Sequence, residues 1–138
     1  MFGIVLISHG GMAEGMMTSA PMLYPDFGQV ECLTLWPEDN PDDFQSKLEQ
    51  KVKDVDTGDG VFILADLLGG TPSNRAAYLL NDKVRMLSGL SLVMLLTLLS
   101  LREDSTDFEE VSKGLLEETH AGIVDVNELL KKREAAVQ

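Results

Sequence analysis

The sequence has only one cysteine, Cys32, so no disulfide can form within the chain. Cys32 lies in an apolar run that is typical of a strand, and we interpret it as a small core residue. No group of cysteine and histidine residues has the spacing of a zinc site. We therefore expect no metal and no other cofactor.

Positive charge is also scarce. The chain has 11 lysine and arginine residues against 23 aspartate and glutamate residues, which gives a net charge of −12 with neutral histidines. Such an acidic chain repels a phosphate backbone, so nucleic acid binding through bulk charge is excluded. Partners with basic surfaces are favoured.

Long apolar segments are missing as well. The most apolar stretch, residues 92–101, is about half as long as the roughly 20 residues that cross a bilayer. Residues 1–7 are apolar but lack the basic residues and the cleavage site of a signal peptide. We expect a soluble, cytoplasmic protein.

Strand-like and helix-like segments alternate along the chain. Strands are predicted at residues 2–7, 29–35, 61–65, 84–90 and, as a short fifth strand, 122–126. Helices are predicted at 12–24, 41–55, 71–81, 91–101, from a cap at Ser105 or Thr106 to 119, and from a cap at Asn127 onward. This order predicts one α/β domain over residues 1–138, a doubly wound three-layer α/β/α fold with a mainly parallel sheet.

Prolines mark several helix ends. Asn40 followed by Pro41, and Thr71 followed by Pro72, are typical of a cap and a first helical turn. Pro21 lies inside the first predicted helix, where it removes a hydrogen bond, so we expect a kink or an early end there.

Two strand ends carry residues suited to chemistry. The first strand ends in Ser8-His9-Gly10-Gly11, and Asp66 follows the third. Ligand sites of parallel sheets lie beyond the carboxyl ends of the strands. If the first and third strands are neighbours, as in doubly wound folds, His9 and Asp66 lie side by side at this edge. A carboxylate that accepts the Nδ1 proton of a histidine leaves Nε2 with a free lone pair, which is a nucleophile. His9 and Asp66 are therefore the predicted catalytic pair.

A phosphoryl group on Nε2 needs donors for its oxygens. Backbone amides of glycine turns and a hydroxyl at a helix start can supply them, and the candidates are Gly10, Gly11, Gly69, Gly70 and Thr71. Each of these residues alone also fits an ordinary turn or cap. Their placement together on one sheet edge indicates a phosphoryl carrier that uses His9.

These motifs resemble the IIA domain of the mannose-type sugar phosphotransferase system (PTS) of bacteria, the mannose/fructose/sorbose family. The resemblance covers almost the whole chain and is most specific at residues 8–10 and 66–74, the latter being close to the family's Gly-Gly-Ser-Pro-x-Asn turn. Thr71 replaces the commoner serine and keeps its hydroxyl. Leu68 replaces a tryptophan of some relatives, and residues 91–94 replace an Asn-x-Pro-Met stretch.

The resemblance implies a function and partners. His9 would accept a phosphoryl group on Nε2 from the general histidine phosphocarrier protein and pass it to a IIB component, here expected as a separate chain, for sugar uptake through membrane subunits IIC and IID. Asp66 would bond Nδ1, and Thr71 would help to hold the phosphoryl group. The resemblance also implies a homodimer in which residues 122–126 form an antiparallel fifth strand swapped between subunits.

Four other functions fit parts of the same pattern. A phosphocarrier subunit that serves a dihydroxyacetone kinase usually has a Gly-Ser-Ala turn, so residues 69–72 favour the sugar branch; a regulatory phosphoprotein of the same fold stays open. A receiver domain phosphorylated on Asp66 needs an acidic pair where Ser8 and His9 stand. A Ser-His-Asp hydrolase is disfavoured because adjacent strand residues point to opposite sides, so Ser8 faces away from His9.

Overall fold

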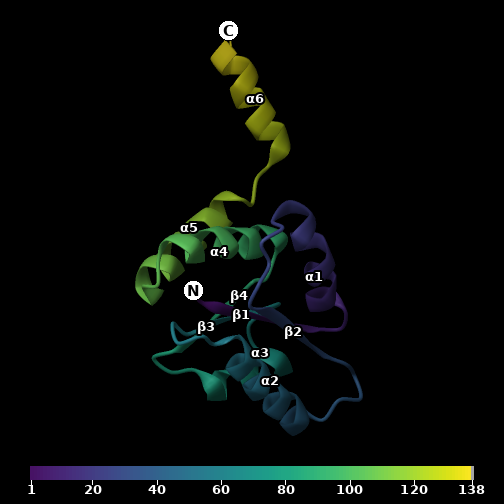
Figure 1. The fold of residues 1–138 in the computed structure, drawn as a ribbon. Helices are drawn as coiled ribbons and strands as arrows, with labels where there is room; N and C mark the ends of the chain where they lie inside the picture. Colours follow the sequence, from purple (N-terminus) through teal and green to yellow (C-terminus); the bar gives the residue numbers. More distant parts are fainter. Residues whose placement is uncertain (138) are drawn as a thin grey trace.

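The computed structural model describes residues 1–137, which form a parallel sheet between two layers of helices (Figure 1). The strands are β1 (Gly3–His9), β2 (Val30–Leu35), β3 (Val61–Ala65) and β4 (Val84–Ser88). Their order in the sheet is β2-β1-β3-β4, and each neighbouring pair is parallel. The predicted α/β fold is therefore confirmed, and β1 and β3 lie side by side at its centre.

Helices cover both faces of the sheet (Figure 1). One face carries α1 (Met12–Leu23), α4 (Leu92–Asp104) and α5 (Phe108–Ala121), and the other carries α2 (Pro41–Val55), α3 (Thr71–Ala76) and the short 3₁₀ helix η1 (Ala77–Leu79). Within the described part of the chain, no helix has both the length and the apolar character needed to cross a membrane.

Alternate residues of β1 point into two separate cores. Ile4 and Leu6 pack in the core beneath α1, α4 and α5, while Val5 and Ile7 pack in the core beneath α2. All four side chains are fully buried. Burial on both faces explains why the sequence of this strand is continuously apolar.

The helix starts follow the sequence signals more closely than the helix ends. The Asn40 side chain caps α2 by accepting the amides of Asp42 and Asp43. Helix α1 does not end early, because it continues past Pro21 to Leu23. A proline so near the end of a helix disturbs only the last turn, where few backbone hydrogen bonds remain to be lost.

Several predicted bounds are wrong by a few residues. The helix that starts at Thr71 ends at Ala76 and continues as η1 only to Leu79, β4 ends at Ser88, and α4 runs on to Asp104. Asp107 caps α5 by accepting the Glu110 amide at 3.1 Å, in place of the predicted Ser105 or Thr106. Several capping residues stand in a row there, and the sequence does not show which one faces the helix.

The predicted fifth strand is not formed within this single chain. Residues 122–125 form no strand, and α6 (Val126–Val137) follows them and extends away from the body of the protein (Figure 1). Asp125, and not Asn127, accepts the Glu128 amide at the start of α6. A strand exists only beside a neighbour that pairs with its backbone. Residues 122–126 have no such neighbour in the described chain, and the swapped homodimer stays a prediction.

Candidate functional site

His9 and Asp66 emerge together from the centre of the sheet. His9 is the last residue of β1, and Asp66 directly follows β3. The Asp66 amide donates to the Ile7 carbonyl at 3.1 Å, which continues the pairing of β1 with β3 by one step. The pairing of β1 with β3 thus places His9 and Asp66 next to each other, as predicted.

The two side chains form a tight hydrogen-bonded pair. Nδ1 of His9 lies 2.7 Å from Oδ2 of Asp66, and the His9 backbone amide donates to the same oxygen at 2.9 Å. The other oxygen, Oδ1, accepts the Leu67 amide at 2.9 Å. The His9 side chain remains 47 % exposed, whereas that of Asp66 is only 9 % exposed.

The charge state of Asp66 follows from these contacts. Burial by itself raises the pKa of the Asp66 carboxyl, but the hydrogen bonds from His9 and from the Leu67 amide outweigh burial and lower that pKa below its usual value. An ionised carboxylate can only accept hydrogen bonds, so Nδ1 of a neutral His9 carries the ring proton. Nε2 then keeps its lone pair.

Gly70 packs directly against the imidazole. A Cβ atom built on Gly70 would lie 2.5 Å from Cε1 and 3.0 Å from Nε2 of His9. No side chain fits there without moving the ring. Two further predicted glycines, Gly10 and Gly69, have positive φ angles of 58° and 92°, which glycine adopts at little cost.

The predicted phosphoryl-binding residues differ in what their amides do. The Gly10 amide donates to the Leu35 carbonyl at 2.9 Å, and the Gly69 amide donates to Oγ of Ser73 at 3.2 Å. The amides of Gly11, Gly70 and Thr71 donate to no acceptor within residues 1–137. Only these last three amides are available to an added anion.

A pocket of about 460 Å³ opens beside the imidazole. His9, Gly10 and Thr71 line one side of it, and the other side comes from the end of β2 and the loop that follows, with Leu35, Trp36, Pro37, Asp39 and Pro41. Sequence reasoning missed this wall. The pairing of His9 with Leu35 in the sheet brings the loop after β2 to the site. The sequence signal that could have revealed this loop is its position directly after a predicted strand.

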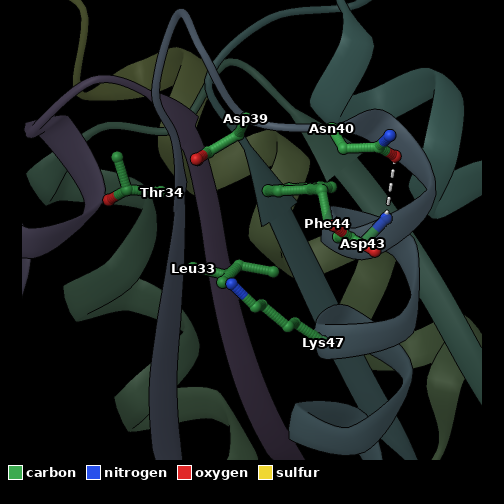
Figure 2. Close-up of a pocket in the computed structure, with 7 residues that line it drawn as sticks. All are labelled: Leu33, Thr34, Asp39, Asn40, Asp43, Phe44 and Lys47. Carbon is green, nitrogen blue, oxygen red and sulfur yellow. Dashed lines mark hydrogen bonds between the residues drawn. The ribbon is translucent and has the colours of Figure 1, made fainter.

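A second hollow lies next to this pocket, between β2 and the start of α2 (Figure 2). Its volume of about 60 Å³ is small, and His9 does not line it. Figure 2 shows Asp39, Asp43 and Lys47 on the α2 side of β2, whereas Thr34 points to the opposite side. Asp39 is shared with the larger pocket. Because His9 lines only the larger pocket, we take that pocket, and not this hollow, as the candidate site.

Fold and site together define an α/β protein that presents a half-exposed histidine, hydrogen-bonded through Nδ1 to a largely buried carboxylate, at the carboxyl edge of a parallel sheet. The family model described as "PTS system fructose IIA component" (EIIA-man) matches residues 3–116. The chain belongs to this mannose-type family of PTS IIA components.

Named relatives agree with this assignment. The chain is 30 % identical over 122 residues to the PTS system mannose-specific EIIAB component of Escherichia coli K12, which covers 87 % of the chain and 38 % of that longer protein. It is 30 % identical over 105 residues to the PTS system fructose-specific EIIA component of Bacillus subtilis, which covers 75 % of the chain and 72 % of the relative.

Solved structures show the same fold. The phosphotransferase system component EIIA from Streptococcus agalactiae superposes with a TM-score of 0.84 at 26 % identity, over 93 % of this chain and 99 % of that one. The mannose/sorbose-specific IIA subunit from Enterococcus faecalis superposes with a TM-score of 0.78 at 25 % identity, over 90 % and 93 %.

Proposed function

We propose that this protein is a histidine phosphocarrier of a bacterial sugar PTS and that His9 carries the phosphoryl group on Nε2. The observation that supports it most is the 2.7 Å contact between Nδ1 of His9 and Asp66 beneath a half-exposed imidazole. This contact directs the free lone pair to Nε2, the nitrogen that Asp66 does not engage.

The transfer involves one bond formed and one bond broken. The Nε2 lone pair attacks the phosphorus of the phosphohistidine on the general histidine phosphocarrier protein, and the donor's P–N bond breaks with its electron pair returning to the donor nitrogen. The Nδ1 proton stays on His9, and the carboxylate of Asp66 stabilises the positive charge that develops on the ring. In the second transfer, a nucleophilic group of IIB attacks the phosphorus on His9. The P–Nε2 bond then breaks, and its electron pair returns to Nε2.

The loops around the ring supply donors to the phosphoryl oxygens. The amides of Gly11, Gly70 and Thr71 and the Thr71 hydroxyl fill this role, since these amides have no protein acceptor within residues 1–137. Gly10 and Gly69 contribute through the shape of their turns, because their own amides are already bound.

The partners are proteins and not nucleic acid or lipid. The general histidine phosphocarrier protein is the donor, IIB is the acceptor, and the membrane is reached only indirectly through IIC and IID, so the carrier acts in the cytoplasm. A relative that is named an EIIAB component joins A and B parts in one chain, which supports IIB as the next carrier. The net charge of −12 favours basic docking surfaces on both partners.

A homodimer is part of the same proposal. Ile123 is 80 % exposed, and Val124 is exposed beside it on the segment that leads into α6. Val126 and Leu130 are exposed on α6 itself. Consecutive exposed apolar residues of this kind mark an interaction surface. Pairing of residues 122–126 with a second copy would cover them.

A cell-free relay tests the function. The protein is incubated with labelled phosphoenolpyruvate, the two general phosphotransfer proteins, its IIB component, membranes that contain IIC and IID, and sugar. Label bound to each protein and label in sugar phosphate are both measured. We expect acid-labile label on the wild type and on His120→Ala, the matched control at the other histidine, and none on His9→Ala. Label on His9→Ala would refute the assignment.

The same relay separates the alternatives. Label that reaches sugar supports transport, whereas label that stops on this chain supports a regulatory phosphoprotein. Transfer of label to a dihydroxyacetone kinase in place of IIB would point to that branch.

A further inference from the structure

Two buried serines hold the two glycine turns that flank His9. Ser8 is fully buried, and its Oγ donates to the Gly10 carbonyl at 3.1 Å and accepts the Ala13 amide at 2.8 Å. Ser73 is 2 % exposed, and its Oγ donates to the Gly70 carbonyl at 3.2 Å and accepts the Gly69 amide at 3.2 Å. Each hydroxyl therefore joins a glycine carbonyl to a nearby amide.

Ser8 fixes the path of the chain from His9 into α1. The N-cap residue of α1 is Gly11, which has no side chain to accept an amide at the helix start. The Ser8 hydroxyl takes over this role for Ala13 from inside the protein. The same hydroxyl holds Gly10, whose φ of 58° turns the chain immediately after His9.

Ser73 fixes the turn that touches the ring. Gly70 lies so close to the imidazole that an added Cβ would clash with Cε1 of His9. A shift of the Gly69–Gly70 turn by a fraction of an ångström would therefore move the ring or open a gap beside it. The Ser73 hydroxyl binds both residues of this turn.

The same bonds help to set the direction of two amides. In a planar trans peptide, the carbonyl of one residue and the amide of the next point in opposite directions. The Gly10 carbonyl points to the Ser8 hydroxyl, so the Gly11 amide points away from it. The Gly70 carbonyl accepts both the Ser73 hydroxyl at 3.2 Å and the Asn74 amide at 2.9 Å, so the Thr71 amide points away from both. A phosphoryl group on His9 would then meet N–H groups, and the carbonyl oxygens that would repel it stay turned away.

We propose that Ser8 and Ser73 are a pair of positioning residues for phosphoryl transfer at His9. The proposal rests on the proposed function. Neither hydroxyl reaches the phosphoryl group, because both are buried and both already have partners. They act through Gly10, Gly70 and the imidazole.

Alanine variants test the pair against a buried serine elsewhere. Ser112 on α5 is 8 % exposed and accepts Nη1 of Arg85 at 2.9 Å, so Ser112→Ala also removes a buried hydroxyl with a hydrogen bond. Phosphorylation of each full-length variant by the phosphorylated histidine carrier protein is measured for kcat and KM, together with Tm. We expect Ser8→Ala and Ser73→Ala to lower kcat by roughly tenfold or more with KM little changed, as for other small misplacements of reacting groups. Ser112→Ala should lower Tm and leave kcat unchanged.

A second readout does not depend on phosphorylation. The ¹⁵N chemical shifts of the His9 ring in the unphosphorylated protein report which nitrogen carries the proton. The proposal predicts altered or broadened His9 ring signals in both alanine variants and wild-type signals in Ser112→Ala. If wild-type protein accepts no phosphoryl group, the proposed function fails, and the ring signals still decide whether the serines position His9.

Cysteine variants keep a weaker hydrogen-bonding group of similar size. Ser8→Cys and Ser73→Cys should give kcat values between those of the wild type and the alanine variants, and they replace an alanine variant that does not fold. Wild-type kcat and wild-type ring signals in the substituted proteins, with a loss of Tm like that of Ser112→Ala, would overturn the proposal and leave both hydroxyls a purely structural role.

Discussion

A single oxygen of Asp66 holds His9 at two points, because Oδ2 lies 2.7 Å from Nδ1 of the ring and accepts the His9 backbone amide at 2.9 Å. The second oxygen, Oδ1, accepts the Leu67 amide. Both oxygens of Asp66 therefore act as acceptors. The side chain sets the rotation of the ring and the position of the backbone that carries it.

Asp66→Asn should damage this arrangement in either orientation of the amide. The NH₂ group would face the Leu67 amide in one orientation and the His9 amide and Nδ1 in the other, and an unsatisfied donor of this kind costs about 1–3 kcal/mol. We expect the rate of His9 phosphorylation to fall by roughly ten- to a hundredfold. Asp82→Asn, at an exposed aspartate before β4, serves as the control. An unchanged rate in Asp66→Asn would rule out the orienting role.

The lowered pKa of Asp66 predicts a defined pH dependence of stability. Hydrogen bonds that overcome the effect of burial place the folded-state pKa below the unfolded value of about 3.9. Ionised Asp66 therefore stabilises the fold above about pH 4, and this contribution is lost as the pH falls through the folded-state pKa. Denaturant unfolding of the wild type and of Asp66→Asn should show a stability difference that is constant near neutral pH and shrinks in acid. A difference that grows in acid would contradict the assigned shift.

Gly70→Ala should displace the His9 imidazole without changing any group that takes part in phosphoryl transfer. The added Cβ would lie 2.5 Å from Cε1 of His9, so the imidazole must move away from its place beside Asp66. We expect roughly a hundredfold slower phosphorylation in the same relay, with the fold retained by circular dichroism. Gly15→Ala is the matched control, since nothing lies within 4 Å of a Cβ on Gly15 in α1. That variant should be as active as the wild type and more stable by about 0.5–1 kcal/mol.

The sequence alone was enough to place the pair at the centre of the site. The apolar runs that became β1 and β3 are unbroken because both faces of each strand are buried, and both runs end at a residue with a reactive side chain. Parallel strands that are neighbours present such residues at one edge. For this reason the sequence predicts that His9 and Asp66 lie together.

The surroundings of the pair depend on relationships that no local pattern encodes. The Trp36 wall of the pocket follows from β2 lying beside β1, and the occupied amide of Gly10 follows from the same pairing. The role of Ser73 depends on which way a buried hydroxyl turns. The predicted strand at residues 122–126 depends on a second copy of the chain, because its backbone has no pairing partner in the described residues of a single chain.

Arg102→Ala should lower the free energy of unfolding strongly and leave phosphoryl transfer at His9 intact in the folded protein. Arg102 is 2 % exposed, and its guanidinium donates to the Phe2 carbonyl at 3.0 Å and to the Gly28 carbonyl at 2.6 Å. These bonds join α4 to the chain before β1 and before β2. Arg102→Ala leaves buried carbonyls without a donor and a cavity beside them, at a cost of about 2–5 kcal/mol. Arg133→Ala, on the exposed face of α6, should change the free energy of unfolding little. Equal stability of the two variants would show that Arg102 is dispensable for packing.

A charged substitution in the exposed apolar segment before α6 should prevent the proposed dimer from forming. Ile123 and Val124 have no cover within the described chain, so a second copy that pairs with residues 122–126 would bury them. We expect sedimentation of the wild type as a dimer. Ile123→Asp should sediment as a monomer, because burial of a charge at a pairing interface costs several kcal/mol, while Glu128→Gln on α6 should remain dimeric. A wild type that sediments as a monomer at concentrations where His9 is phosphorylated would show that the carrier works without a partner copy.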